Sequence, residues 1–260
     1  MFFLIMKRRR DRRLKTVSAR HGHAKVETET ELVKKIVSWI LQPKFIILLI
    51  LINLAAYFWS ATLSPQIFEN LTFHPENILN LNFPPIIASW FLHANLAHLT
   101  ANLIFLYVFG RVVERKFGAF KTALIYFGAA IISDLISGLV FQQGGIGASG
   151  AIAGLIAAAV IIDPFYLNYI IFGLPIPIVV LGWVAIFADI LGLIKPLETS
   201  VGHIAHLAGF FGITLLIFLF NRKNEKIKKG FLINILTIAV VVALHFFNIN
   251  IPNIIQRFTK

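Results

Sequence analysis

One stretch decides the fold: residues 144–154, which read GGIGASGAIAG. This glycine-rich turn delivers a serine, Ser149, to the start of an apolar helix over residues 150–162. Those 13 residues cover about 20 Å, whereas the hydrocarbon core of a bilayer is roughly 30 Å thick. Asp163 and Pro164 close the helix at one membrane face, so Ser149 is expected about 10 Å below the other face.

Backbone that is not helical survives at such a depth only inside protein or beside a water-filled cavity. The turn therefore predicts a serine hydroxyl at the bottom of a wet pocket within a membrane protein. The alternative is a plain crossing of packed helices, because small residues let transmembrane helices approach closely. The rest of the chain has to decide between these two interpretations.

The composition indicates a polytopic membrane protein. Of the 260 residues, 58% are hydrophobic and only 14% are charged, which does not fit a water-soluble globule. The absence of cysteine excludes disulfides, a thiol nucleophile and a thiolate metal site. A signal peptide is not expected at the N-terminus, because the apolar run 1–6 is short and its arginines follow it.

The first 44 residues are predicted to lie outside the hydrophobic core. Residues 7–25 form a basic arm that is too polar to bury a core, and we expect it to be disordered or to lie on anionic lipid headgroups. Residues 27–41 carry one apolar helical face, which suits a helix in the membrane interface. A helix that binds a partner protein is the competing interpretation.

Seven apolar segments follow, and their lengths mostly fit helical spans. They lie at about 45–61, 93–110, 122–140, 149–162, 170–194, 203–220 and 231–247. The predicted fold is therefore an all-α polytopic membrane protein with three regions: the arm and interfacial helix (1–44), a six-helix core (45–220), and a basic loop with a seventh helix (221–260).

The distribution of lysine and arginine predicts the orientation. With the basic arm in the cytoplasm, alternating spans put 21 of the 24 Lys and Arg residues inside and leave Lys195, Arg257 and Lys260 outside. That bias is what the positive-inside rule describes. The N-terminus is predicted to be cytoplasmic and the C-terminus outside, in a multi-pass protein of the cell membrane. The net charge of +12 is then an orientation signal, and no nucleic-acid partner is expected.

This topology places four polar side chains at similar depth near the outer face. Ser149 opens the fourth span, His98 and Asn102 share one face of the second, and His206 lies about 8 Å down the sixth. Polar groups inside a membrane are costly and by default indicate function. Plain hydrogen bonding between helices is the alternative for each histidine taken singly.

Acyl transfer is the chemistry that suits this set. Ser149 needs a base such as His206 to remove its proton. The oxyanion of the tetrahedral intermediate then needs hydrogen-bond donors. Asn102, His98 and the backbone N–H of Ser149 are candidates for these donors. Asp134 and Asp189 lie inside spans, but neither has an obvious third role at this depth, so a Ser-His dyad is expected rather than a triad.

At these residues the sequence resembles the rhomboid family of intramembrane serine proteases, from roughly Trp90 to Phe220. Four motifs occur in family order. They are HxxxN at His98 and Asn102, GxxxExxxG at Gly110, Glu114 and Gly118, GxSG at Gly147, Ser149 and Gly150, and AHxxG at His206 and Gly209.

The resemblance implies a six-helix rhomboid core plus one C-terminal transmembrane helix, and an endopeptidase acting in or near transmembrane segments of other proteins. Ser149 would be the nucleophile, His206 the base, and His98 with Asn102 the oxyanion site. The family needs no metal or organic cofactor. Two other classes stay open: a catalytically inactive rhomboid-like binding protein, and a transporter that uses Asp134, Asp189 and the Pro175/Pro177 break.

Two positions depart from the family pattern. Pro84 and Pro85 stand where the family usually carries Trp-Arg in its first outer loop. Ala153 stands where many members place an aromatic residue against the catalytic histidine. The outer loop over residues 62–92 contains no Lys or Arg, and we expect it to lie partly in the outer interface.

Overall fold

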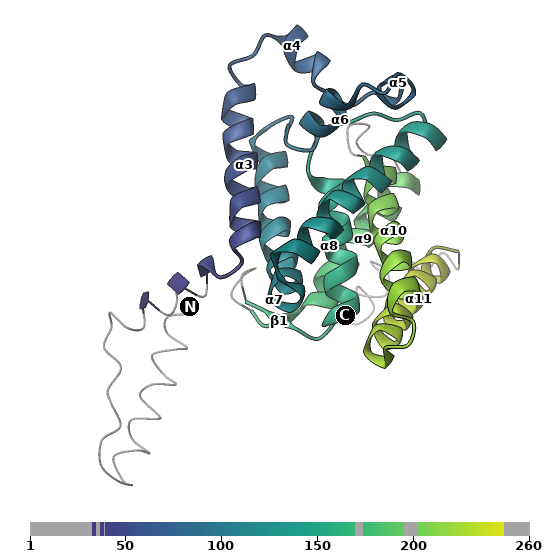
Figure 1. Ribbon diagram of the computed structural model, residues 1–260. Coiled ribbons are helices and arrows are strands. Elements are labelled where there is room, and N and C mark those ends of the chain that lie inside the picture. Colours follow the sequence, from purple (N-terminus) through teal and green to yellow (C-terminus); the bar gives the residue numbers. More distant parts are fainter. Residues whose placement is uncertain (1–32, 35–36, 39, 170–173, 195–201, 247–260) are drawn as a thin grey trace, which may run out of the picture.

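The computed structural model describes residues 33–34, 37–38, 40–169, 174–194 and 202–246, and it is almost entirely helical (Figure 1). This confirms the all-α class. The basic arm 7–25 and the C-terminal residues 247–260 lie outside the described residues. Of the helix expected over 27–41, the described residues 33–34, 37–38 and 40–41 are helical.

The first core helix, α3 (Lys44–Ser60), agrees with the segment expected at 45–61. The outer loop after it folds into three short helices: α4 (Pro65–Asn70), α5 (Pro75–Leu79) and α6 (Phe83–Ser89). Each has a proline in its first turn, where the missing N–H needs no partner. Pro84 and Pro85 are the prolines in the first turn of α6. In Figure 1 these helices cap one end of the bundle.

The second and third expected segments form α7 (Leu96–Leu135), which is followed by a π-helical turn, η1 (Ile136–Val140). Gly118 interrupts α7 with φ 79° and ψ 168°, a left-handed conformation that favours glycine. The chain folds back there, because His98 near its start and Ser133 near its end both lie beside the Ser149 turn.

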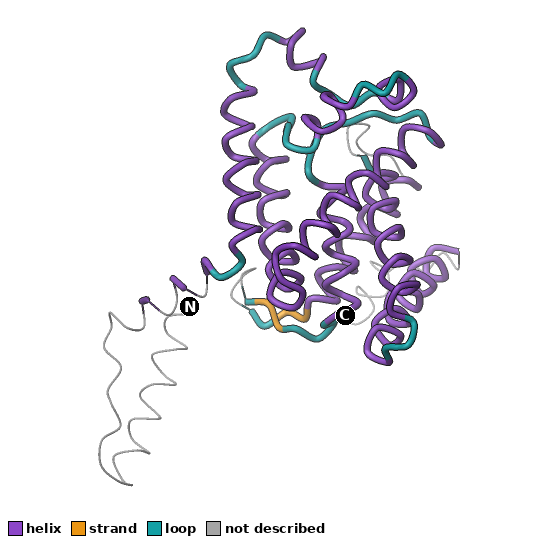
Figure 2. The backbone as a smooth tube through the Cα atoms, in the orientation of Figure 1, coloured by secondary structure: helices purple, strands orange, loops and turns teal. Residues whose placement is uncertain are grey.

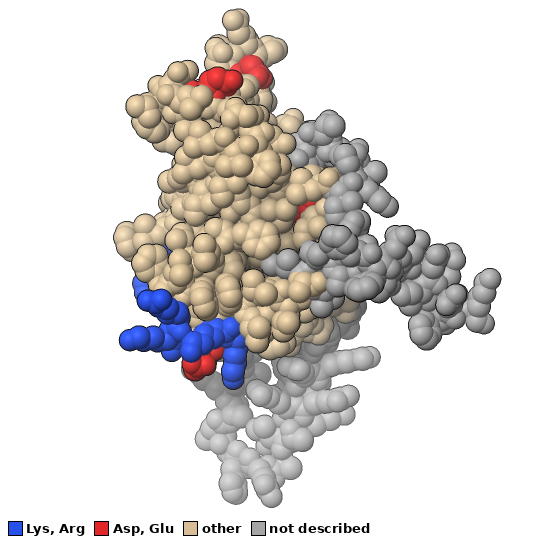
Figure 3. Space-filling view, turned by 90° about the vertical axis from the view of Figure 1, so that its right-hand side faces the viewer, with Lys and Arg blue, Asp and Glu red and all other residues tan. Residues whose placement is uncertain are grey.

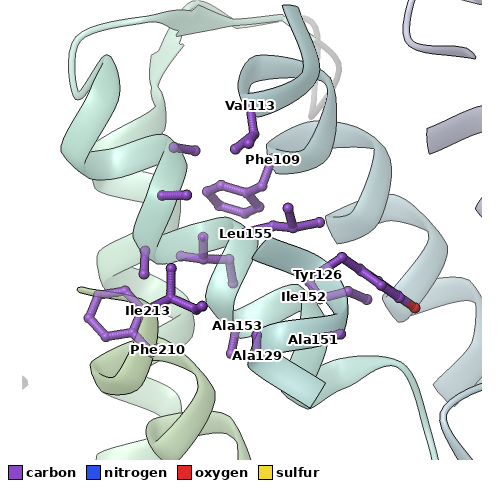
Figure 4. Close-up of a cluster of buried hydrophobic side chains, with 14 of the residues drawn as sticks. Phe109, Val113, Tyr126, Ala129, Ala151, Ile152, Ala153, Leu155, Phe210 and Ile213 are labelled. Atoms are coloured by element: carbon purple, nitrogen blue, oxygen red, sulfur yellow. The ribbon is translucent and has the colours of Figure 1, made fainter. Parts of the chain in front are cut away.

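Helix α8 (Ser149–Ile162) is the centre of the bundle and has the bounds that the sequence predicted. It contacts α7, α9, α10 and α11, and every residue from Gly150 to Ile161 is buried. Figure 4 shows part of this packing, where Ala153 of α8 lies in one cluster with Ala129 of α7 and Ile213 of α10.

The expectation of one helical segment over 170–194 was wrong at its start. Helix α9 begins only at Ile178 (Ile178–Ile194), and a two-stranded antiparallel pair precedes it, β1 (Leu167–Asn168) with β2 (Ile176–Pro177). A residue before proline is pushed towards extended backbone. Leu174 and Ile176 both precede a proline, and Ile176 lies in β2. Figure 2 shows the pair at the end of the bundle opposite α4 to α6.

The last two helices are α10 (His203–Asn221) and α11 (Glu225–Phe246). α11 begins six residues before the apolar segment expected at 231–247. Asn224 caps its polar first turn, because the side-chain oxygen of Asn224 accepts the backbone N–H of Lys226 at 3.0 Å. Gly230 lets α11 approach the end of α8, because a Cβ there would overlap the backbone of Ile161.

Two helical stretches in the described residues are long and apolar enough to cross a membrane, Leu96–Val140 and His203–Asn221. Lys44–Ser60, Ser149–Ile162 and Ile178–Leu193 are shorter apolar helices. The Lys and Arg side chains on the face shown in Figure 3 gather at one end, and the opposite end shows acidic side chains without Lys or Arg.

Glu114 ties α3 to the middle of α7, one turn before its interruption at Gly118. Its two carboxylate oxygens accept the backbone N–H groups of Phe45 and Ile46, each at 2.9 Å. The first amides of a helix have no partner within the helix, so this carboxylate satisfies two of them. Gly110, one turn earlier, leaves room for Ile46, whose side chain would overlap a Cβ there.

Replacing Glu114 by alanine is expected to lower the free energy of unfolding by about 1.5–3 kcal/mol, the range for hydrogen bonds to a charged group. Thermal unfolding in detergent, followed by circular dichroism, measures this. Glu225→Ala is the matched control, because Glu225 is exposed and its ion pair is with Lys228, in the next turn of the same helix. An equal midpoint in both variants would show that the cap contributes nothing.

Candidate active site

The outer loop holds the glycine-rich turn in place through backbone hydrogen bonds. Phe73 and Gly145 exchange two of them, at 3.2 and 2.9 Å, and the N–H of Gly147 donates to the carbonyl oxygen of Ser89 at 2.8 Å. Phe73 is 2% exposed, whereas its partner Gly145 is exposed, so the bridge joins a buried loop residue to the surface of the turn. The loop over residues 62–92 therefore supports the turn that ends in Ser149.

Gly147 brings His98 against this turn. Its φ of 121° favours glycine, and a Cβ at this position would lie 2.9 Å from both Cε1 and Nε2 of the His98 ring. The Oγ of Ser149 is 3.7 Å from the same point. The structure thus brings together His98 from α7 and Ser149 from α8, which are 51 positions apart in the sequence.

Several neighbours fix His98. Asn95 caps α7, and its side-chain oxygen accepts the backbone N–H of His98 at 2.8 Å. The ring of His93 meets that of His98 edge to face, with centroids 5.1 Å apart. Burial, and then the nearby His98, lowers the pKa of His93 to about 4, so this loop histidine is neutral at pH 7.

Asn102 lies one turn below His98 and is 6% exposed. Its side-chain nitrogen donates to the carbonyl oxygen of His98 at 2.9 Å, and its buried side-chain oxygen has no hydrogen-bond partner in the structure. The assignment of oxygen and nitrogen in such an amide follows from the hydrogen-bond network. An amide nitrogen carries two hydrogens, so one donor remains for a further acceptor.

His206 on α10 faces an acidic partner. Its Nδ1 lies 2.8 Å from Oδ1 of Asp189 on α9, and Nδ1 of His203 lies at the same distance from the same oxygen. Sequence analysis gave Asp189 no obvious third role, yet the structure places its carboxylate against His206. Asp189 stands near the end of α9 and His206 near the start of α10, so these two helix ends meet at this contact.

Ser149 and His206 sit at the contact between α8 and α10. A Cβ at Gly150 would lie 3.7 Å from the carbonyl oxygen of Ala205, the residue before His206. His98 and His206 are also close enough to interact electrostatically. No hydrogen bond between the Ser149 hydroxyl and His206 occurs in the described part of the chain. Such bonds are often long before substrate binds.

Gly150 and Gly209 set how closely these helices approach. A Cβ at Gly209 would overlap the carbonyl oxygen of Gly150 and lie 2.7 Å from Oγ of Ser133, and a Cβ at Gly150 would lie 2.5 Å from the same Oγ. The helices α7, α8 and α10 therefore meet at these three residues. Sequence reasoning did not identify Ser133 or His203, although the spacing of three between His203 and His206 puts both on one helix face.

Gly209→Ala is expected to destabilise the protein by about 1–3 kcal/mol, because backbone atoms at the crossing have no room to move. It should also lower any activity of the site by moving His206. Gly128→Ala is the matched control, since Gly128 lies within α7 with nothing within 4 Å of a Cβ. This control should be neutral or gain up to about 1 kcal/mol from helix propensity. Equal effects in thermal unfolding would contradict the close crossing.

A family model described as the Rhomboid domain matches residues 82–223, which contain His98, Asn102, Ser149, Asp189 and His206. The chain belongs to the rhomboid family. Its similarity extends to Rhomboid-like protein 11, chloroplastic, of Arabidopsis thaliana, at 33% identity over 167 residues, which cover 57% of this chain and 59% of the relative.

Two bacterial rhomboid relatives carry the word protease in their names. Rhomboid protease AarA of Providencia stuartii is 33% identical over 195 residues, covering 62% of this chain and 66% of the relative. Rhomboid protease GlpG of Haemophilus influenzae is 30% identical over 124 residues, covering 47% and 62%. The chain thus spans about three fifths of the length of each of these three relatives. Membership of the rhomboid family makes it a membrane-embedded protein.

Proposed function

We propose that this rhomboid is an intramembrane serine endopeptidase that hydrolyses peptide bonds in or near transmembrane segments of other membrane proteins. The observation that carries the proposal is the position of Ser149. It starts a short buried helix, is framed by Gly147 and Gly150, and lies beside His98 and next to the helix that carries His206. The two relatives named as proteases support the same function class.

His206 is the proposed base. A serine hydroxyl becomes a good nucleophile only when a neighbouring imidazole takes its proton. The carboxylate of Asp189 accepts from Nδ1 of His206, which keeps the lone pair on Nε2 and directs that nitrogen away from Asp189. Asp189 is then a positioning residue, with the role that a buried carboxylate has in a Ser-His-Asp triad.

The proposed oxyanion site consists of His98, Asn102 and the backbone N–H of Ser149. Donors of this kind stabilise the negative charge that develops on the carbonyl oxygen in the tetrahedral intermediate. Ser149 is the first residue of α8, where backbone amides have no partner within the helix. The positive end of the helix dipole adds to this stabilisation.

The proposal also covers the orientation of the protein in the membrane and its substrates. Six core helices and a seventh would span the membrane, with the N-terminus and the basic end in the cytoplasm and the C-terminus outside. The basic arm would lie on anionic headgroups, and transmembrane proteins would be the substrates. The grouping of Lys and Arg at one end of the visible face supports this orientation.

A catalytically inactive rhomboid-like binding protein is the second candidate, because several relatives are named only rhomboid-like. The presence of both Ser149 and His206 favours the protease. The transporter alternative loses its support, since both acidic residues have local partners. Asp134 accepts the indole N–H of Trp90 at 2.6 Å, and Asp189 serves the two histidines.

The deciding experiment is labelling with a fluorophosphonate, combined with cleavage of a transmembrane reporter in proteoliposomes. Ser149→Ala and His206→Ala should each abolish cleavage, and the double variant should be no worse, because coupled catalytic groups act as one unit. Ser60→Ala is the matched control, a buried serine at the end of α3. Cleavage and labelling that persist in Ser149→Ala would refute the assignment. An unlabelled, inactive wild type would favour the binding protein.

The oxyanion donors make a separate prediction. His98→Ala and Asn102→Ala should each lower turnover by about 10²–10³, the usual effect of losing one donor, in protein that remains folded. Asn53→Ala is the control, because Asn53 makes the same bond to the carbonyl oxygen four residues earlier, but in α3. Native turnover in both site variants would place the oxyanion site elsewhere.

A further inference from the structure

One side-chain cluster beside the proposed active site has more members than the acyl-transfer chemistry needs. Asp189, His203 and His206 offer one carboxylate oxygen and two imidazole nitrogens, and these atoms all lie within 4.8 Å of one another. Orienting His206 requires only the one hydrogen bond that it donates to Asp189, yet a second imidazole shares the same oxygen. His203 is therefore unexplained by the proposed mechanism.

The packing around His203 holds it in this position. A Cβ at Gly192 would overlap the ring of His203, so α9 leaves room for that ring where a side chain would exclude it. The two histidine rings are nearly perpendicular, at 84°, with centroids 6.3 Å apart. They therefore approach the carboxylate from different directions instead of stacking on each other.

We propose that Asp189, His203 and His206 form a binding site for a divalent transition-metal cation such as Zn²⁺, and that the bound cation inhibits the enzyme. Two histidine nitrogens and one carboxylate oxygen are a common protein ligand set for zinc, with water in the fourth position. The three side chains are 12–17% exposed, which leaves an entry path for an ion.

The geometry of the cluster is close to what the cation needs. In a tetrahedral zinc site with bonds of ~2.0–2.2 Å, neighbouring ligand atoms lie about 3.3–3.5 Å apart. The two distances from nitrogen to Oδ1 are 2.8 Å. Each must therefore lengthen by about half an ångström, which small side-chain rotations at Asp189 provide.

The inhibition follows from the two nitrogens of one imidazole. A neutral imidazole carries a single N–H, and the other nitrogen has a free lone pair. When Nδ1 of His206 binds the cation, the proton sits on Nε2, and Nε2 has no lone pair left to accept the proton of Ser149. The bound cation requires the proton on Nε2 of His206, whereas the reaction requires a free lone pair there, so the two exclude each other. This inhibitory part rests on the proposed function, whereas the binding site itself does not.

The first experiment measures binding without activity. Full-length Ser149→Ala protein in detergent, which also carries His21→Gln and His23→Gln to remove the histidines of the basic arm, is titrated with Co²⁺. The expected result is a visible absorption band of a tetrahedral complex that saturates at one ion per chain and disappears when Zn²⁺ is added. A lack of any saturable band would overturn the proposal.

Variants then locate the ion. His203→Gln removes one ligand atom and should weaken binding by more than the ~10–100-fold that losing an outer-shell partner costs. His74→Gln is the matched control, because it removes an exposed histidine whose carboxylate partner, Glu69, lies at 3.2 Å in the outer loop. Unchanged affinity in His203→Gln, or an equal loss in His74→Gln, would overturn the site.

The second experiment tests inhibition in enzyme with a native Ser149. Zn²⁺ should suppress fluorophosphonate labelling and reporter cleavage, EDTA should restore both, and His203→Gln should shift inhibition to at least about 10-fold higher Zn²⁺, relative to its own rate without zinc. Full activity with the site occupied would overturn the inhibitory role. Protein that binds Co²⁺ in one site but neither labels nor cleaves without zinc would overturn the proposed function and leave the metal site standing.

Discussion

The structure depends on how closely backbones approach around one short helix. α8 is buried from Gly150 to Ile161, and several of its closest contacts are possible only because a neighbour or α8 itself has a glycine there. Gly150 and Gly154 provide this room on α8, Gly209 on α10 and Gly182 on α9. Within a membrane the hydrophobic effect does not favour helix association, so close van der Waals packing of this kind has to hold the bundle together.

This packing also positions Ser149 and its neighbour His98. Ser149 stands where α8 begins, and the turn before it is fixed by backbone hydrogen bonds to the outer loop, through Phe73 and Ser89. Gly147 is the point where that turn meets His98. Ser149, the proposed nucleophile, is thus supported from the loop side by hydrogen bonds and from the helix side by close contact, and neither support requires a charged group.

Two carboxylates, those of Glu114 and Asp189, accept hydrogen bonds at different places in the bundle. Glu114 satisfies the first amides of α3 near the basic end, and Asp189 accepts from imidazoles next to the proposed active site. Both bind hydrogen-bond donors that would otherwise lack partners in apolar surroundings, where an unpaired polar group is costly. In the case of Asp189, the same arrangement creates a potential metal site beside the proposed base.

The sequence by itself determined the class of the protein, the bounds of α8, the serine at its start, and the candidate partners His98, Asn102 and His206. These follow from apolar periodicity, glycine spacing and short motifs, all of which are local. Only the tertiary structure decided that residues 174–177 include a strand, that Glu114 binds α3, and that Asp189 serves both His203 and His206. Such contacts depend on how far each helix is rotated about its own axis, and that rotation is set by packing between different helices, for example where Gly182 of α9 meets Val160 and Ile156 of α8.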